Sequence, residues 1–221
     1  MIFHTASDPV YYHAFYKYYL RSIKQFYSKS KMSLYFIGQE LPINSSIDIL
    51  EHDNFSFEKI QQTYNSTIEN AKGYYALSRW RSMPVLDDHV VVSDIDIIAI
   101  KHLPLSKIDD LLINHEVINI TRTKKGGSEG GMAMMIIRKD VVESINQKAT
   151  EVLDNKLQWD SDVQVRSFIY NNYNVAQLPE MHVFGKKTNY QTFDNTTRSF
   201  AIHKGRIDTK IASLKKAVDY L

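Results

Sequence analysis

The stretch Val90-Val91-Val92-Ser93-Asp94-Ile95-Asp96-Ile97-Ile98 decides the fold, because it joins an uninterrupted aliphatic run to two aspartates. Such a run, bounded by polar residues, is typical of a strand that is buried on both faces of a sheet. Ligands of open α/β sheets gather beyond the carboxyl ends of these strands. Residues two apart in an extended chain face the same side, so the sequence predicts that Asp94 and Asp96 present two carboxylates to one crevice.

Paired carboxylates at a strand end suit a hard divalent cation. Mg²⁺ and Mn²⁺ prefer oxygen ligands, and such a cation in turn suits a phosphate-bearing substrate. The alternative is a strand end at which Asp94 and Asp96 only cap the following turn, so the rest of the sequence has to decide between the two.

Composition and charge narrow the class of protein. The 221 residues suffice for one domain with a substantial core, and no Pro/Gly/Ser-rich linker divides them. Lys and Arg number 27 against 25 Asp and Glu, and this net charge of +2 is too balanced to indicate nucleic acid or a membrane surface as the main partner. Cysteine is absent, which excludes disulfides and thiolate metal sites.

Targeting segments are not indicated by the sequence. No run of about 18 apolar residues occurs, and the N-terminus lacks a basic segment followed by a long apolar stretch. We therefore expect a soluble cytoplasmic protein without an integral membrane segment.

Strand and helix patterns alternate along the chain. Besides the aspartate strand, we expect strands at 1–5, 34–37, 47–50, 117–120, 132–137 and 175–178. We expect helices from Pro9 onward and at 71–81, 141–153, 163–170 and 208–220, and a glycine-rich loop at 123–131. Without a repeat of fixed period, this alternation predicts an α/β fold with a mixed sheet.

Four short segments spread over nearly the whole chain carry a resemblance to a known family. They are Thr5-Ala6-Ser7-Asp8-Pro9-Val10-Tyr11, Ala76-Leu77-Ser78-Arg79-Trp80-Arg81-Ser82-Met83-Pro84, Val92-Ser93-Asp94-Ile95-Asp96 and Ala201-Ile202-His203-Lys204-Gly205-Arg206-Ile207-Asp208-Thr209-Lys210. In this order they resemble the GT-A-fold glycosyltransferases, most nearly the family 8 or glycogenin-like group.

The resemblance implies both a fold and an activity. The fold would be a GT-A-like, Rossmann-type mixed β-sheet flanked by helices, in a single domain over 1–221. The nucleotide-binding part would span about 1–100 and the acceptor-side part about 101–221. The activity would be metal-dependent transfer of a hexosyl group from a nucleotide-diphosphate sugar, a UDP-sugar as first candidate, to a hydroxyl acceptor in glycan or polysaccharide synthesis. Retention at the anomeric carbon is implied by the same group.

Residue roles follow from the matched motifs. Asp94, Asp96 and His203 would bind Mn²⁺ or Mg²⁺, and Asp94 would also reach ribose or sugar hydroxyls. Contacts to the nucleotide sugar would come from Thr5, Ala6, Tyr11, Arg79, Asp94, Ile95, Gly205 and Lys210. Tyr11 or Tyr12 would stack on the base, and Lys204 or Arg206 would add positive charge near the phosphates.

The catalytic assignments are Asp162, Asp94 and Arg79. Arg79 or Arg81 would meet the diphosphate or the donor sugar, and residues two apart on a helix diverge, so one of the two does not. Asp162 or Asp160 would lie near the anomeric centre or the acceptor hydroxyl, although either could instead cap a helix. Gly130-Gly131 would line the donor sugar, or form an ordinary hairpin.

Departures from the family pattern concern the acceptor side. The chain is short for the group, the usual large insert after the metal strand is lacking, and no Pro-Trp follows Lys210. One alternative is a haloacid-dehalogenase-like phosphatase, but its nucleophile normally lies near the start of the chain, whereas 93 residues precede Asp94. The other is a non-catalytic nucleotide- or carbohydrate-binding protein of the same fold. The joint presence of Asp94, Asp96 and His203 argues against it.

Overall fold

The computed structural model describes residues 1–7, 9–36, 49–51, 77–99, 102–120, 134–154, 161–178, 183–184 and 201–203. The strands are β1 (Ile2–Ser7), β2 (Lys31–Phe36), β3 (Ile49–Glu51), β4 (His89–Ser93), β5 (Ile97–Ala99), β6 (Val117–Asn119), β7 (Met134–Arg138), β8 (Val175–Gln177), β9 (Val183–Phe184) and β10 (Ala201–His203). The helices are α1 (Pro9–Phe26), α4 (Leu105–Asn114), α5 (Lys139–Asp154) and α6 (Ser161–Asn172), and residues 77–81 are helical as well.

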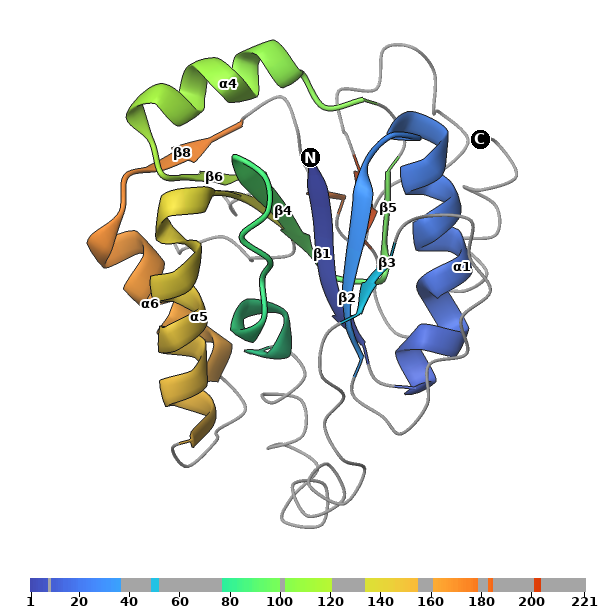
Figure 1. Ribbon diagram of the computed structural model, residues 1–221, viewed down its shortest axis with the longest axis horizontal. Helices are drawn as coiled ribbons and strands as arrows, with labels where there is room; N and C mark the ends of the chain where they lie inside the picture. The colour runs from blue at the N-terminus through green and yellow to red at the C-terminus, as the bar shows by residue number, and fades with distance from the viewer. Residues whose placement is uncertain are drawn as a thin grey trace.

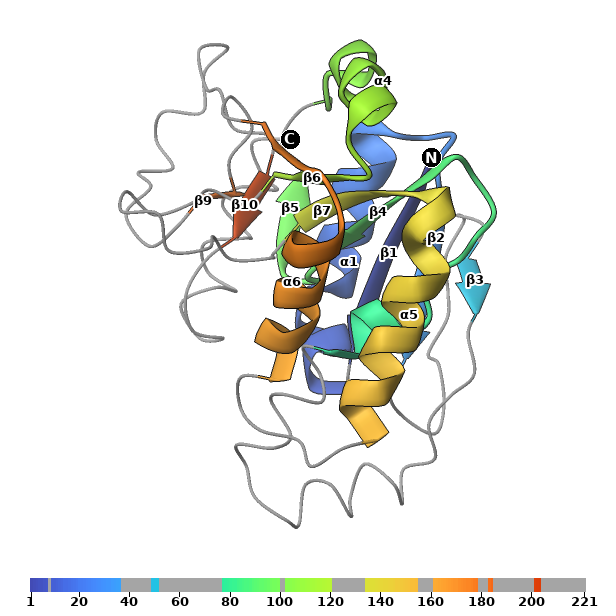
Figure 2. The same ribbon diagram turned by 90° about the vertical axis from the view of Figure 1, so that its left-hand side faces the viewer.

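A seven-stranded mixed sheet forms the centre of the molecule, in the order β3-β2-β1-β4-β7-β6-β8. Strand β1 pairs in parallel with β2 and β4, whereas β7 runs antiparallel to β4 and β6. Helix α1 covers one face of this sheet, and α5 and α6 cover the other (Figures 1 and 2). The predicted α/β class, with a mixed sheet between layers of helices, is confirmed.

Both faces of β4 are buried, which explains its uninterrupted aliphatic run. Val91 belongs to the hydrophobic cluster that includes Phe15 of α1, whereas Val90 and Val92 belong to the cluster that includes Trp80 and residues of α5. Alternate residues of the strand therefore enter two different cores, and their aliphatic side chains fill both of them.

A second, three-stranded sheet begins where β4 ends. Its order is β5-β10-β9, with β10 antiparallel to β5 and parallel to β9. The predicted strand through Asp94 and Asp96 is therefore wrong in its geometry. The chain leaves the large sheet after Ser93, turns through residues 94–96 and enters the small sheet at Ile97, whose N–H donates to the Asp94 carbonyl oxygen at 3.3 Å.

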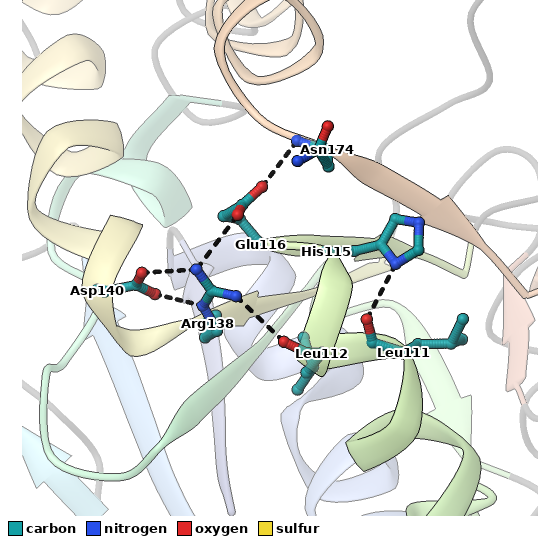
Figure 3. Close-up of polar contacts among 7 residues, drawn as sticks. All are labelled: Leu111, Leu112, His115, Glu116, Arg138, Asp140 and Asn174. Carbon is teal, nitrogen blue, oxygen red and sulfur yellow. Dashed lines mark hydrogen bonds and ion pairs between the residues drawn. The ribbon is translucent and has the colours of Figure 1, made fainter.

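Arg138 holds several elements together (Figure 3), and it lies at the opposite end of β4 from Asp94. It ends β7, opposite His89 at the start of β4. Its Nε and Nη2 donate to both carboxylate oxygens of Asp140 at 2.7 Å, its Nη2 also meets Glu116 at 3.2 Å, and its Nη1 donates to the Leu112 carbonyl at 3.1 Å. This network ties the end of α4 to β7 and the start of α5.

The predicted and the observed elements differ in two further ways. The glycine-rich loop at 123–131 and the closing helix at 208–220 lie outside the described residues, whereas α4 and strands β9 and β10 were not predicted. Of the helices that the structure describes, none combines the length and the apolar character needed to span a bilayer.

Candidate functional site

The turn that follows β4 carries both predicted metal-binding aspartates. Asp94 is partly exposed, Asp96 is 4% exposed, and the side chain of Ile95 between them is buried in the cluster of α1. The two carboxylates thus come from a turn whose middle residue is anchored in the core. Both carboxylates are placed by this turn, and not by the alternation of a strand.

Arg79 contacts this turn from the helical residues 77–81. Its Nη1 forms a direct ion pair with Asp94 Oδ1. Arg79 is 7% exposed, and its guanidinium carbon lies 5.3 Å from the centre of the Trp80 ring. Burial lowers the pKa of Arg79 to about 10, while the negative charges of Asp162 and Asp96 act in the opposite direction. Arg79 therefore stays protonated at neutral pH.

Three carboxylates interact with this one guanidinium. Asp94 pairs with Arg79 directly, and Asp96 and Asp162 act on it electrostatically. Three negative charges less one positive charge leave a formal charge of −2 at this place. A divalent cation would offset that charge, and carboxylate oxygens are the ligands that Mg²⁺ and Mn²⁺ prefer.

Asp162 reaches the group from a distant part of the chain. It lies in the first turn of α6, and its side chain is partly exposed. The sequence left Asp160 and Asp162 as alternatives, and Asp160 lies outside the described residues. Arg79, one of the two arginines that the sequence offered, contacts Asp94.

The main chain of His203 lies beside the turn. His203 ends β10 and pairs with Ile97, the residue that directly follows Asp96. The antiparallel register therefore brings the third predicted metal ligand next to the first two in the backbone. Among the side chains that the structure describes, no three of His, Cys, Asp or Glu come together as a set of metal ligands. The side chain of His203 is not among those described.

Among the residues predicted to contact the nucleotide sugar, Thr5 and Ala6 lie in β1, Tyr11 lies in α1, and Asp94 and Ile95 follow β4. Thr5 is fully buried, and its hydroxyl donates to the Ser93 carbonyl oxygen at 2.8 Å, so a contact from Thr5 would come from its main chain. The same holds for the buried Ile95. Ala6 is partly exposed, and the partly buried ring of Tyr11 lies 5.3 Å from that of Phe15. Gly205, Lys210, Lys204, Arg206 and Gly130-Gly131 lie outside the described residues.

Buried hydroxyls behind the turn were missed in the sequence. Tyr19 Oη lies 2.7 Å from Ser93 Oγ, and Ser22 Oγ accepts a hydrogen bond from the Ala99 N–H at 3.1 Å. The available signal was a tyrosine among apolar residues, followed three positions later by a serine on the same helix face. A buried phenol requires a polar partner, so Tyr19 indicated that such a partner exists.

Comparison with known proteins identifies the fold. No protein-family model and no curated protein matches the sequence. Among solved structures, the chain is similar to the galactosyltransferase LgtC in complex with donor and acceptor sugar analogues, with a TM-score of 0.60, 13% identity, and coverage of 100% of this chain and 96% of LgtC. An active-site mutant of LgtC gives a TM-score of 0.56 at 12% identity, with coverage of 97% of this chain and 95% of the mutant.

A second glycosyltransferase has the same fold over part of its length. GlyE of Streptococcus pneumoniae TIGR4 matches with a TM-score of 0.53 and 14% identity over 81% of this chain. The match covers 45% of the GlyE chain, so this chain corresponds to less than half of that protein. At these identities the likeness concerns the fold alone, and this chain has the GT-A-like mixed α/β fold of these glycosyltransferases.

Proposed function

We propose that this protein is a metal-dependent glycosyltransferase that moves a hexosyl group from a nucleotide-diphosphate sugar, with UDP as the first candidate nucleotide, to a hydroxyl of a glycan acceptor. The observation that supports this most directly is the gathering of Asp94, Asp96 and Asp162 around Arg79 at the end of β4. The fold shared with LgtC and GlyE agrees with it.

The acidic turn is suited to hold a divalent cation. Asp94 and Asp96 would bind Mn²⁺ or Mg²⁺ together with His203, whose backbone pairs with Ile97. The bound ion would supply Lewis acidity that offsets the negative charge developing on the diphosphate leaving group. The formal charge of −2 around Arg79 favours a divalent over a monovalent cation.

Arg79 and Asp162 would act on the two sides of the bond that breaks. Arg79 would stabilise the leaving diphosphate, since two unit charges about 4 Å apart interact by roughly 4 kcal/mol at an effective dielectric constant of about 20. Asp162 would lie near the anomeric carbon, where positive charge develops on the sugar ring. The family resemblance adds retention of anomeric configuration to this proposal.

The rest of the donor would lie along the ends of β1 and β4. In this proposal Tyr11 stacks on the base, and the main chains of Thr5, Ala6 and Ile95 contact the nucleoside. Gly205 and Lys210 would meet the diphosphate.

Thermal unfolding with UDP, with and without Mn²⁺, tests this proposal, because a ligand of the folded state raises the Tm in proportion to its affinity. We expect UDP to raise the Tm only when Mn²⁺ is present, and Mn²⁺ to support slow hydrolysis of a UDP-sugar. Binding without any hydrolysis or transfer would instead identify a non-catalytic nucleotide-binding protein. Failure of every nucleotide tested, with either metal, to shift the Tm would overturn the proposal.

A further inference from the structure

We propose that helix α1 positions the aspartate turn through two buried hydroxyls, with Tyr19 holding the residue before the turn and Ser22 holding the strand after it. Tyr19 and Ser22 would then be positioning residues of the metal site, and this inference rests on the proposed function. The two residues are three positions apart on α1, so they lie on the same face of the helix.

Tyr19 holds the beginning of the segment. Its hydroxyl lies 2.7 Å from Ser93 Oγ, and Ser93 directly precedes Asp94. The carbonyl oxygen of Ser93 accepts a further hydrogen bond from the Thr5 hydroxyl at 2.8 Å. Tyr19, Ser93 and Thr5 are all at most 1% exposed. Water cannot replace these contacts without opening the core, so the position of Ser93 is fixed from two sides.

Ser22 holds the end of the segment. Its hydroxyl donates to the Tyr19 carbonyl oxygen at 2.8 Å and accepts from the Ala99 N–H at 3.1 Å. Ala99 is the last residue of β5, and Ser22 is fully buried. Because the Ser22 hydroxyl donates its proton to a carbonyl oxygen of its own helix, the lone pairs of the hydroxyl oxygen remain free to accept the hydrogen bond from the Ala99 N–H. This backbone N–H would otherwise be buried without a partner on that side.

Ile95 completes the attachment between these two points. Its side chain is 4% exposed and packs in the same cluster as Phe15 and Tyr19. The segment is thus held by hydroxyls of α1 at its start and its end and by the hydrophobic core at its middle, and Asp94 and Asp96 flank the buried residue. Their direction is set by the fold before any ligand binds, as expected of groups that orient metal ligands from behind.

A general role in stability is the competing explanation, and the chain offers a matched control for it. Tyr173 and Ser144 form another hydroxyl pair, between the end of α6 and α5. Both members of this pair lie on the α5 and α6 side of the molecule, whereas Tyr19 lies in α1. Tyr173→Phe therefore removes a hydrogen bond of the same kind without touching the α1 contacts.

The test measures Mn²⁺ affinity by calorimetry in the presence of UDP, together with the Tm, for the wild type, Tyr19→Phe, Ser22→Ala and Tyr173→Phe. We expect Tyr19→Phe and Ser22→Ala to weaken Mn²⁺ binding by about tenfold, in line with losses of outer-shell partners at other metal sites, whereas Tyr173→Phe leaves the affinity unchanged. Ser22→Thr, which keeps the hydroxyl, should restore the affinity lost in Ser22→Ala.

A second measurement does not depend on the metal. Hydrogen exchange of the Ala99 amide in the metal-free protein should be faster in Ser22→Ala than in the wild type and in Tyr173→Phe. If the wild type binds Mn²⁺ with UDP and both α1 variants bind it equally well, the positioning role is overturned while the proposed function stands. If the wild type itself binds no Mn²⁺, the proposed function fails, and the positioning role fails with it. Unchanged exchange at Ala99 would by itself overturn the role of Ser22 in holding β5.

Discussion

The guanidinium of Arg79 and the carboxylate of Asp94 form an ion pair, and Arg79 is almost fully buried. The two residues come from different elements, since Arg79 lies in the helical residues 77–81 and Asp94 follows β4. Two further carboxylates act on the same guanidinium. Arg79 is therefore the central positive charge of an acidic group.

Arg79→Ala should destabilise the protein strongly. Removal of one partner of a buried pair leaves the other charge uncompensated, at a cost of about 3 kcal/mol or more in the free energy of unfolding. Urea unfolding without metal measures this loss. The variant retains three carboxylates without their cation, so Mn²⁺ should raise its Tm by more than it raises that of the wild type. Equal metal-induced shifts in the two proteins would contradict the charge balance described for this site.

Asp96→Asn should separate metal binding from stability. The substitution reduces the formal charge around Arg79 from −2 to −1, so the Tm of the metal-free protein should stay level or rise. Mn²⁺-dependent binding of UDP should fall by about 100-fold or more, because a direct ligand is lost. Calorimetry checks the affinity, and Asp110→Asn on α4, where the aspartate is exposed, serves as the control. Unchanged UDP affinity in the presence of Mn²⁺ would remove Asp96 from the metal site.

The sequence predicted the strand at this place better than the turn that follows it. Val90 to Val92 indicated a strand buried on both faces because each residue enters a core, and this part was confirmed. The turn at Asp94 was not visible, because the hydrogen bond from Ile97 to Asp94 leaves no mark in residue types. Aliphatic residues on both sides of the two aspartates give the same sequence pattern whether one strand continues through them or the chain passes from one sheet to another.

Other omissions have different causes. Helix α4 has apolar residues at helical spacing in Leu105, Ile108 and Leu112, but it is short and follows directly on the aspartate segment, so its signal was overlooked. Tyr19 lies in the helix expected from Pro9 onward, but helical periodicity does not reveal the contact of its hydroxyl with Ser93. Contacts between elements distant in sequence depend on packing, and periodicity describes only one element at a time.

The Arg138 network should make stability depend on pH in acid. Hydrogen bonding to Arg138 lowers the pKa of Asp140 from its ordinary value of 3.8. A carboxyl whose pKa is lower in the folded than in the unfolded protein adds stability above the unfolded value, and this contribution is lost as the pH falls through the folded pKa. Below pH 4 the free energy of unfolding should therefore decrease.

Asp140→Asn tests this contribution by urea unfolding at pH 7 and pH 3. Because the Asp140 side chain is 57% exposed, solvent screening limits the effect to about 1 kcal/mol or less. The variant should lose that amount at pH 7 and less at pH 3. An equal loss at both pH values would show that the carboxylate charge does not contribute. Mn²⁺ affinity should be the same as in the wild type, since Arg138 lies at the other end of the sheet.

His203 offers the most direct chemical test of the metal site. It pairs with Ile97 through the main chain, so His203→Ala should preserve the pairing of β10 with β5 while removing the imidazole. Spin-echo spectroscopy of bound Mn²⁺ detects a coordinated nitrogen, and we expect this coupling in the wild type and its loss in His203→Ala, together with a drop in Mn²⁺ affinity of about 100-fold. His115→Ala is the control, because it removes an imidazole at the C-terminal end of α4. The His115 ring nitrogen Nδ1 lies 3.0 Å from the Leu111 carbonyl oxygen there (Figure 3). Nitrogen coupling that persists in His203→Ala would assign the third ligand to another residue, since backbone pairing brings His203 close to the turn without requiring its ring to face the metal.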